Sequence, residues 1–597
     1  MPQSSQLATS SKNTMPPPTD SPPPFSMRAP ASWLRPLEVK ILQTLVQPSI
    51  LTALCSPPSS TSSAASPTRM VTRSVVSQAP GTPETAPLPA GTVPVLRIAG
   101  GWCRDRLLGR HSLDIDIAID CTSGKAYAVA MQHAGALAKV ATIAANPAQS
   151  KHLETARIRI AGIWIDLVNL RAESYASDAA HRIPEARYGT PREDALRRDL
   201  TINALFFNLT TGEFEDATGQ GIPDLVDRVL RTPRPPRETF IDDPLRVLRV
   251  ARFAARLPTF QLHPELYGAA RDPTVRDALA RKVSRERIGL ELEGLCAAVD
   301  PLRGLTALAD WNVLGVVLCG PGSGLDGDDG DARITREVPL SVRRAKTFTD
   351  VIAWRRERGT AVAGLPALAD ETERPVAIDE QFVPTLPGVT VPRTPDQDPL
   401  LRSHRERVGF VGALLSPHFG VEVTLRKGKT MEFSQHVLRE GLKWPVRDSA
   451  ALASLAVAVP TFVDVLRADK QLDRLETGRL LLRVHDLWRT ALWVATAVLA
   501  TEETTDEGRA EVLRRCEATE LHIATSLSMD ECWEWPPLID GTSLVTELAL
   551  PKGPIVGRLL SAITDARFSQ PDLTRDQALQ HARQVRDADP SLKKRRV

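Results

Sequence analysis

Hydrophobic and polar residues change their spacing along the chain, and the change divides it into regions. From about residue 93, short runs rich in β-branched residues, VPVLRIAG, LDIDIAID and ARIRIAGIWIDLVNLR, are separated by stretches with helical spacing. Alternation with a period of two is typical of strands that bury one face, and strands mixed with helices are typical of a compact domain. Residues 93–240 are therefore predicted to form an α/β or α+β domain.

The spacing becomes helical after residue 240 and stays helical over most of the remaining chain. Residues 241–319 and 403–597 are predicted to be helical, with one short strand expected in FGVEVTL. Between them, residues 320–402 are rich in Gly, Pro and Asp and are predicted to form an insertion or a long surface loop. The helical spacing is clearest after residue 241, where apolar residues recur at Leu245, Leu248, Val250, Phe253 and Leu257.

Residues 1–92 differ from the rest of the chain in composition. They are rich in Pro, Ser and Thr, and we expect them to form a disordered leader. Within the leader, Leu37–Gln47 is an apolar stretch between Pro36 and Pro48 that predicts a short helix. With basic residues nearby and few acids, this stretch is compatible with a mitochondrial targeting segment. The alternative is a flexible tail without a targeting signal.

Charge and cysteine usage narrow the classes of function. The chain has 597 residues with 74 Lys and Arg against 72 Asp and Glu, so any nucleic-acid contact has to come from local basic patches. Its seven Cys form no CxxC pair, which argues against a zinc ribbon or a small disulfide scaffold and suits a reducing compartment. The longest apolar stretches, 449–459 and 490–500, are shorter than the ~20 residues of a membrane span, so no membrane partner is expected.

The first group of candidate site residues lies in IAGGWCRDRLLGRHSLDIDIAID, residues 98–120. A strand is predicted to end at Gly100 and Gly101, and a helix to start near Trp102. Paired glycines allow a ligand to approach the backbone, and free N–H groups at a helix start favour phosphate, to which Arg104 adds positive charge. These residues are candidates for binding a phosphate group.

Two carboxylates follow in the same block. Asp114 and Asp116 are separated by one isoleucine in a predicted strand, so both face the same side. Such acids repel each other unless a cation lies between them, and two Mg²⁺ ions bridged by them and by triphosphate oxygens would activate an attacking hydroxyl. Asp166, in a predicted adjacent strand, is a candidate third metal ligand or general base. Solvated strand acids are the alternative for the pair, and a turn acid is the alternative for Asp166.

A second block, EDALRRDLTINALFFNL, places Arg197, Arg198 and Asp199 ahead of Asn203. Adjacent arginines and a carboxylate at a helix start can bind the phosphates and ribose hydroxyls of a nucleotide through charge-assisted hydrogen bonds. A solvated basic turn with the aspartate as helix cap would have a similar sequence.

A third block, DDPLRVLRVAR at residues 242–252, spaces Asp243 and Arg246 three residues apart. One acceptor and one donor side by side match cytosine and adenine, which each present an amine donor beside a ring-nitrogen acceptor, and reject guanine and uracil. The alternative is a helix capped by Asp243, with Pro244 as its first residue and a basic stripe of Arg246, Arg249 and Arg252. The two interpretations are compatible.

Taken in order, these blocks resemble the class II CCA-adding enzymes, or tRNA nucleotidyltransferases, of the polymerase β-like superfamily. GGWCRD with DID is similar to the family's first motif, RRDLTINAL to its ribose-recognition motif and DDPLRVLR to its amino-acid template for the base. DATGQGIPDL, KHLETA and SRERIGLELE, the last resembling the neck-region motif, are further similarities, and GIWIDLVNLR resembles the eukaryotic branch. The template begins with Asp242, where many relatives have Glu.

The resemblance implies an α+β fold: a nucleotidyltransferase head with a small mixed sheet (93–240), a helical neck with the base template (241–319) and a helical body and tail that bind tRNA (403–597). It implies Mg²⁺-dependent addition of C, C and A, from CTP and ATP, to the 3′ end of tRNA. The residue roles that it implies are metal binding by Asp114 and Asp116, triphosphate contact by Gly101 and Arg104 with help from Arg249 and Arg252, nucleotide contact by Arg198, and base reading by Asp243 and Arg246.

Several questions stay open from the sequence. Poly(A)-adding, A-only or CC-only polymerases share the head motifs, and a tRNA-binding protein with an inactive head is disfavoured by the presence of both aspartates. We expect a monomer in the mitochondrion, the cytoplasm and the nucleus, the last because Lys593–Arg596 could serve as an import signal. Candidates for RNA contact in the helical part, with solvated surface as the alternative, are Arg426, Lys427, Lys429 and Arg479.

Overall fold

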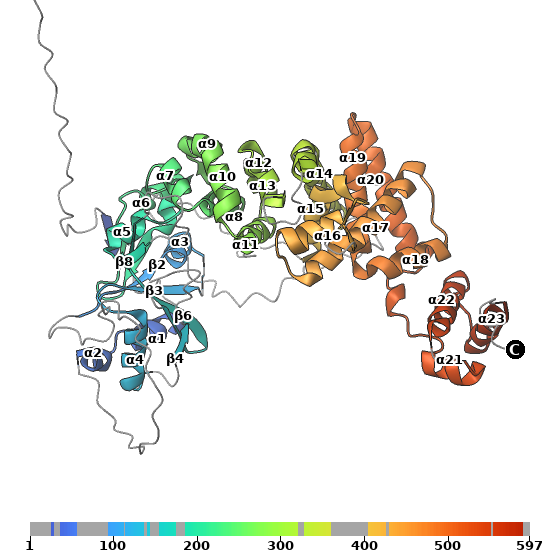
Figure 1. Cartoon of the computed structure of the whole chain (residues 1–597), viewed down its shortest axis with the longest axis horizontal. Helices are drawn as coiled ribbons and strands as arrows, with labels where there is room; N and C mark the ends of the chain where they lie inside the picture. The colour runs from blue at the N-terminus through green and yellow to red at the C-terminus, as the bar shows by residue number, and fades with distance from the viewer. Residues whose placement is uncertain are drawn as a thin grey trace, which may run out of the picture. The chain divides into compact units, whose positions relative to one another are not determined.

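The chain folds into two compact units in the computed structural model (Figure 1). The first unit, here called the head, extends to Asp227 and includes Arg231–Arg234, and the second, the helical unit, contains Arg228–Leu230 and the chain from Pro235. The structure describes residues 25–28, 36–55, 93–110, 112, 114–136, 140–143, 155–174, 185–319, 328–359, 404–424, 429–550 and 553–588.

The head is built on an eight-stranded sheet in the order β1-β10-β9-β2-β3-β6-β5-β4, which confirms the predicted mixed sheet. Its neighbouring strands are antiparallel except for β3 and β6, which are parallel. Two further strands, β7 (Arg171–Ser174) and β8 (Glu185–Tyr188), form a separate antiparallel pair. The strands of the sheet are β1 (Phe25–Arg28), β2 (Leu96–Ala99), β3 (Ile115–Ile119), β4 (Val140–Ile143), β5 (Thr155–Ile160), β6 (Ile163–Asn169), β9 (Leu205–Asn208) and β10 (Glu213–Asp216).

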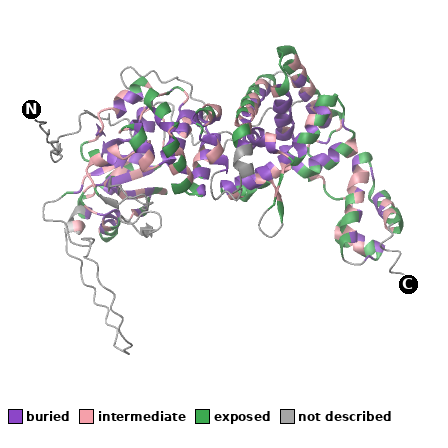
Figure 2. Ribbon diagram, turned by 45° about the horizontal axis from the view of Figure 1, so that its top comes forward, coloured by how far each residue is buried: buried purple, intermediate pink, exposed green. Residues whose placement is uncertain are grey.

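Alternation along the strands decides which face of the sheet is buried. In β5, Ala156 and Ile158 are buried while Arg157 and Arg159 are exposed, and Ile165 and Leu167 of β6 continue the buried face. Helix α4 packs against β4, β5 and β6, and Figure 2 shows the buried residues inside each unit. The helices of the head after residue 93 are α3 (Gly101–Leu107), α4 (Gly124–His133), α5 (Pro191–Leu196) and α6 (Gly221–Asp227).

The N-terminal region contributes to the head, which corrects the prediction of a disordered leader for residues 25–28 and 36–55. Helix α1 (Pro36–Leu45) confirms the helix predicted at Leu37–Gln47, and α2 (Pro48–Cys55) follows it. The physical reason is burial: Ile41 and Leu45 are fully buried, and the Tyr127 hydroxyl of α4 donates to the Leu45 carbonyl at 2.5 Å. The other leader residues lie outside the described ranges.

Substitution within α1 tests this contribution. We expect Ile41→Ala to lower the free energy of unfolding by about 2–4 kcal/mol, because it removes a buried side chain and leaves a cavity. Lys40→Ala, at the exposed neighbouring position, is the matched control and should stay within about 0.5 kcal/mol. Thermal or denaturant unfolding measures both, and equal stabilities would mean that α1 does not pack on the head in solution.

The first part of the helical unit confirms the helical pattern predicted from residue 241. One short parallel pair, β11 (Val229–Leu230) with β12 (Gln261–Leu262), accompanies it. Its helices are α7 (Pro236–Asp242), α8 (Leu245–Arg256), α9 (Pro264–Ala270), α10 (Pro273–Lys282), α11 (Arg285–Cys296), α12 (Pro301–Asp310) and α13 (Leu314–Cys319).

A long helix replaces much of the loop predicted over residues 320–402. Helix α14 (Asp328–Gly359) has 32 residues, including Pro339, and packs against α15 (His404–Leu415) and α19 (Trp488–Glu502). Composition favoured a loop, but four apolar residues at helical spacing are buried and drive helix formation: Ala345, Phe348, Val351 and Ile352. Near the two ends of the connection to α15, Arg356 and Glu406 form an ion pair. The rest of the predicted loop, 320–327 and 360–402, lies outside the described residues.

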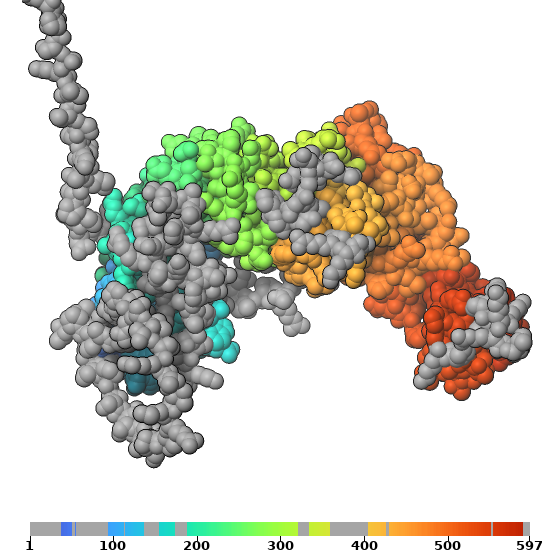
Figure 3. Space-filling model, in the orientation of Figure 1, coloured from blue at the N-terminus to red at the C-terminus, as the bar shows by residue number. Residues whose placement is uncertain are grey.

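The remaining helices form the second part of the helical unit, with a short hairpin of β13 (Glu422–Thr424) and β14 (Thr430–Glu432) that confirms the strand expected in FGVEVTL. The last three helices, red in Figure 3, surround a small core of their own. In chain order, the helices of this second part not yet given are α16 (Phe433–His436), α17 (Val446–Ala468), α18 (Arg474–Val484), α20 (Asp506–Leu521), α21 (Gly541–Leu548), α22 (Pro554–Ser569) and α23 (Arg575–Ala588).

One described helix, α17, is long and apolar enough to cross a membrane by length and composition alone. It continues through Pro460, the residue directly after the apolar stretch 449–459, and its most apolar window is 56% buried inside the protein. Core helices also pass this test, so it is weak evidence for a membrane span.

Candidate active site

The predicted glycine turn joins β2 to α3. Gly100 has φ 75° and donates its N–H to the Leu205 carbonyl at 2.9 Å. A Cβ at Gly100 would lie 2.7 Å from Nη1 of Arg198, so this position combines a left-handed backbone with a close approach that favour glycine. At Gly101 the corresponding position lies 3.6 Å from Nη2 of Arg104. The turn is therefore flanked by two guanidinium groups, one from each of two sequence blocks.

A buried polar network connects the first two blocks. Arg104, 3% exposed, donates from Nη1 to Oδ1 of Asn203 at 2.6 Å and contacts Asp105 through Nε and Nη2, both at 2.8 Å. Asn203 in turn donates to Oδ1 of Asp199 at 3.1 Å. The structure thus brings together Arg104, Asp199 and Asn203. Arg104 and Asn203 are 99 residues apart in the sequence.

Arg198 is held by a carboxylate that sequence reasoning did not single out. Asp194, buried on α5, accepts from Nη2 of Arg198 at 2.9 Å and from Nη2 of Arg197 at 2.6 Å. Burial would raise the pKa of Asp194, but Arg198 and Arg197 outweigh burial and the pKa lies below its usual value. The sequence did contain a signal for these contacts. Asp194 lies three residues before Arg197 and four before Arg198, a spacing at which side chains of a helix meet, and Thr190 caps that helix.

The three candidate catalytic carboxylates lie on neighbouring strands. The parallel register of β3 and β6 pairs Asp116 with Asp166, and exposed Asp114 directly precedes β3. Burial, and then the negative charges of Asp114 and Asp166, raise the pKa of Asp116 to about 6. The structure therefore brings all three together, with Asp166 also paired to Nε of Arg157 at 3.2 Å.

Two observations bear on a bound metal. Among the described residues, no group of three or more His, Cys, Asp or Glu side chains is arranged to hold an ion by itself. The mutual repulsion of Asp114, Asp116 and Asp166 is nevertheless the kind that a cation relieves, and carboxylate oxygens are hard ligands that suit Mg²⁺. The donor set fits a divalent ion that completes its coordination with substrate oxygens.

The third block lies in the helical unit. Asp243 lies between two helices: it is the C-cap of α7, and its Oδ1 accepts from the N–H of Leu245, the first residue of α8, at 3.3 Å, as the capping interpretation expects, although the N-cap position itself is Pro244. The carboxylate of Asp243 pairs with Nη2 of Arg287 on α11 at 3.2 Å. Arg246, 6% exposed, donates from Nη1 to the Thr239 carbonyl at 3.4 Å. Both candidate base readers are thus held by neighbours, and Arg287 is a residue that sequence reasoning missed.

The basic stripe of α8 also faces α11. Glu291 accepts from Nε of Arg252 at 2.6 Å and from Nη1 of Arg249 at 3.4 Å, and both guanidinium groups lie near the ring of Phe253. The basic stripe of the alternative interpretation is thus present on α8, and two of its arginines are paired with Glu291. Glu291 lies in the neck-like motif SRERIGLELE, which was the signal for this contact.

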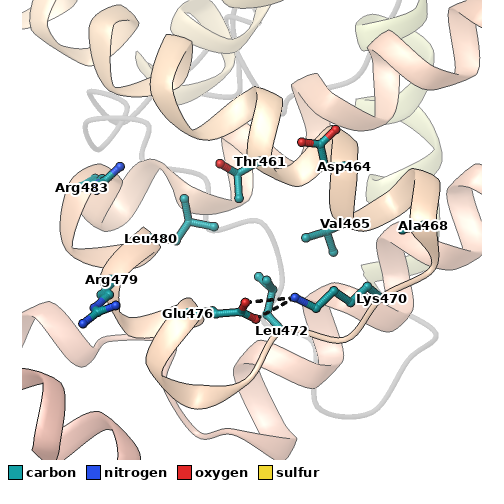
Figure 4. A pocket seen from close by; sticks show the side chains of 10 residues that line it. All are labelled: Thr461, Asp464, Val465, Ala468, Lys470, Leu472, Glu476, Arg479, Leu480 and Arg483. Carbon is teal, nitrogen blue, oxygen red and sulfur yellow. Dashed lines mark hydrogen bonds and ion pairs between the residues drawn. The ribbon is translucent and has the colours of Figure 1, made fainter.

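A separate pocket of about 420 Å³ lies between α17 and α18 (Figure 4). Basic and acidic residues line it together: Lys470 pairs with Glu476 at 3.0 Å, and Arg479 pairs with Asp565 at 2.7 Å. RNA contact by Arg479 and Lys429 stays a prediction, and Arg426 and Lys427 lie outside the described residues.

A mixed sheet with carboxylates on neighbouring strands, beside a glycine turn flanked by arginines, defines a nucleotidyltransferase head. Residues 96–231 match the family model described as Poly A polymerase head domain. The chain is 31% identical over 509 residues to the mitochondrial CCA tRNA nucleotidyltransferase of Saccharomyces cerevisiae, covering 82% of this chain and 88% of the relative. It is also 31% identical to tRNA nucleotidyltransferase cca1 of Schizosaccharomyces pombe, covering 81% of this chain and 90% of the relative.

The chain belongs to the CCA tRNA nucleotidyltransferase family, as the motifs indicated. Among solved structures, the Bacillus stearothermophilus CCA-adding enzyme in complex with CTP has a TM-score of 0.49 and 19% identity, covering 83% of this chain and 94% of that one. The family assignment stands on the two yeast relatives.

Proposed function

We propose that this chain adds C, C and A to the 3′ end of tRNA, using CTP and ATP and no nucleic-acid template. Family membership supports the reaction, since the two yeast relatives are named as tRNA nucleotidyltransferases. One structural observation supports placing the reaction in the head. The β3–β6 register sets Asp116 opposite Asp166, and Asp114 is close enough to raise the pKa of Asp116.

In this proposal Asp114 and Asp116 bind two Mg²⁺ ions, and Asp166 is the third catalytic acid. Bound Mg²⁺ would lower the pKa of the attacking hydroxyl and balance the charge of the leaving pyrophosphate. The terminal 3′ oxygen of tRNA forms a bond to the α-phosphorus while the bond from that phosphorus to the pyrophosphate breaks. Asp166 lies on the neighbouring strand, where its carboxylate can accept the hydroxyl proton or bind the second ion.

The triphosphate is proposed to bind at the glycine turn. Arg104 and Arg198 flank Gly101 and Gly100, where the absence of side chains lets the two guanidinium groups approach the backbone of the turn. Asn203 fixes Arg104 and Asp194 fixes Arg198, so both cations are held before a nucleotide arrives. The remaining members of the predicted nucleotide site are Asp199, as a ribose contact, and Arg249 and Arg252, as triphosphate contacts.

The base is proposed to be read by Asp243 and Arg246. We expect Arg246→Ala to reduce the preference for CTP and ATP over GTP and UTP by about 10-fold or more, since one lost pairing contact is worth ~1–3 kcal/mol. The KM for the correct nucleotide should change less than this preference. Incorporation of each nucleotide into tRNA ending before CCA measures the effect, and unchanged base selectivity would reject the reading role.

Nucleotide addition to tRNA that lacks CCA tests the overall proposal. Purified protein with Mg²⁺ should add three residues only when CTP and ATP are both supplied. A long A tail, A alone or CC alone would favour the related partial polymerases, and no product would favour an inactive tRNA-binding protein.

We further propose that the protein acts in mitochondria, since two relatives are named as mitochondrial enzymes. We also propose that the protein is present in the nucleus and the cytoplasm and that it is a monomer. Fluorescence of a full-length C-terminal fusion would map the compartments, and light scattering of the purified chain would give its mass in solution.

A further inference from the structure

The exposed face of β5 and β6 carries a large aromatic side chain beside two arginines. Trp164 is 45% exposed, and the guanidinium carbons of Arg157 and Arg159 lie 5.5 Å and 5.7 Å from its ring centroid. Trp102, Trp311 and Trp488, by contrast, are buried. A ring flanked by guanidinium groups yet open to solvent is the arrangement that binds an unpaired nucleic-acid base.

This ring lies beside the catalytic carboxylates. The parallel register pairs Ile115 of β3 with Ile165 of β6, so the residues that precede this pair are Asp114 and Trp164. They lie two residues before the pair of Asp116 with Asp166. Trp164 and Asp166 are two apart in β6 and share one face. Arg157 connects them, since its Nε lies 3.2 Å from the Asp166 carboxylate while its guanidinium lies over the Trp164 ring.

The pairing of β5 with β6 places both arginines against the Trp164 ring. Arg159 is the direct cross-strand partner of Trp164, so a simple strand pair would account for that contact. Arg157, the direct partner of Asp166, is the diagonal neighbour of Trp164 and so reaches the same ring. The ring and both arginines therefore continue the catalytic face.

We propose that Trp164 is the platform on which the terminal base of the accepting tRNA stacks during nucleotide addition. This inference rests on the proposed function, which requires the 3′ hydroxyl at the carboxylates and hence its own base close by. The terminal base is the last base of the incoming tRNA before the first addition and C before the second and third, and stacking tolerates any base because every base has a π-face. Arg157 and Arg159 supply positive charge for the adjacent phosphate.

Steady-state kinetics with tRNA that lacks CCA tests the platform. Trp164→Ala should raise the KM for tRNA about 10-fold or more, within the range that stacking of one base supports, and leave the KM for CTP within about 2-fold. Trp164→Phe should restore the KM for tRNA to within about 3-fold of wild type, because it keeps an aromatic face. Tyr267→Ala, at an exposed aromatic residue of α9, is the control and should match wild type.

A binding measurement separates this inference from the reaction. With 2-aminopurine as the terminal base, wild type and Trp164→Phe should quench its fluorescence, and Trp164→Ala should not. Unchanged quenching in Trp164→Ala, an unchanged KM for tRNA, or equal defects in the Ala and Phe variants would overturn the platform. Quenching by a wild-type protein that adds no nucleotide would support the platform while refuting the proposed function.

Discussion

Asp116→Asn is expected to lower the rate of nucleotide addition by about 10³-fold or more while the head stays folded. The amide keeps the size of the side chain but removes the charge that would bind a divalent ion between β3 and β6. Because Asp114 and Asp166 repel the Asp116 carboxylate, its removal should leave the melting temperature unchanged or raise it. Single-turnover incorporation of CTP and a thermal melt measure the two effects.

Asp120→Asn is the matched control for this change. Asp120 follows the other end of β3, and its Oδ1 accepts from the Val95 N–H at 3.0 Å, a hydrogen bond that an amide oxygen can retain. We expect near-normal turnover in this variant and near-normal tRNA binding in both. If Asp116→Asn kept full activity, the assignment of metal binding to these carboxylates would be wrong.

Asp194→Ala is expected to lower the free energy of unfolding by about 3–5 kcal/mol and to raise the KM for CTP and ATP. The buried carboxylate holds Arg197 and Arg198 and accepts from the Arg171 N–H, so its loss leaves charged groups without their partner. Denaturant unfolding measures the first effect and nucleotide titration the second. Asp224→Ala, at another buried carboxylate of the head, controls for stability loss alone and should leave the nucleotide KM closer to wild type.

The pH dependence of stability offers a second measurement of Asp194. Its folded-state pKa lies below the unfolded value of ~3.9, so its stabilising contribution is present above that value and is lost as the pH falls through the folded pKa. Wild type should therefore lose more stability than Asp194→Asn below about pH 4. Parallel acid titrations of the two proteins would contradict the ion pairs.

Local pattern was sufficient to predict the chemistry-bearing strands. Asp114, Asp116 and Asp166 lie in alternating runs, so their shared face followed from the period of two, and the β3–β6 pairing agrees with it. The pairing of Asp166 with Arg157 could not be predicted, because the register of two strands depends on the turn and on packing rather than on either strand alone.

Composition was a poorer guide where burial decided the structure. Residues 36–55 and 328–359 are surrounded by Pro, Gly and polar residues, and both were expected to be irregular outside Leu37–Gln47. Each forms helices because a few apolar side chains, such as Ile41 and Phe348, are buried against distant parts of the chain. Partners such as Glu291 for Arg252 depend on how two helices pack, which single-sequence patterns do not contain.

The ion pair between Arg356 and Glu406 has a practical consequence for altering this protein. It joins α14 to α15 beside the points where residues 360–403 leave and rejoin the described chain. When the two ends of a connection are fixed next to each other, doubling its length costs only ~0.6 kcal/mol of closure entropy. A reporter domain or an affinity tag placed in this connection should leave the packing of α14, α15 and α19 intact.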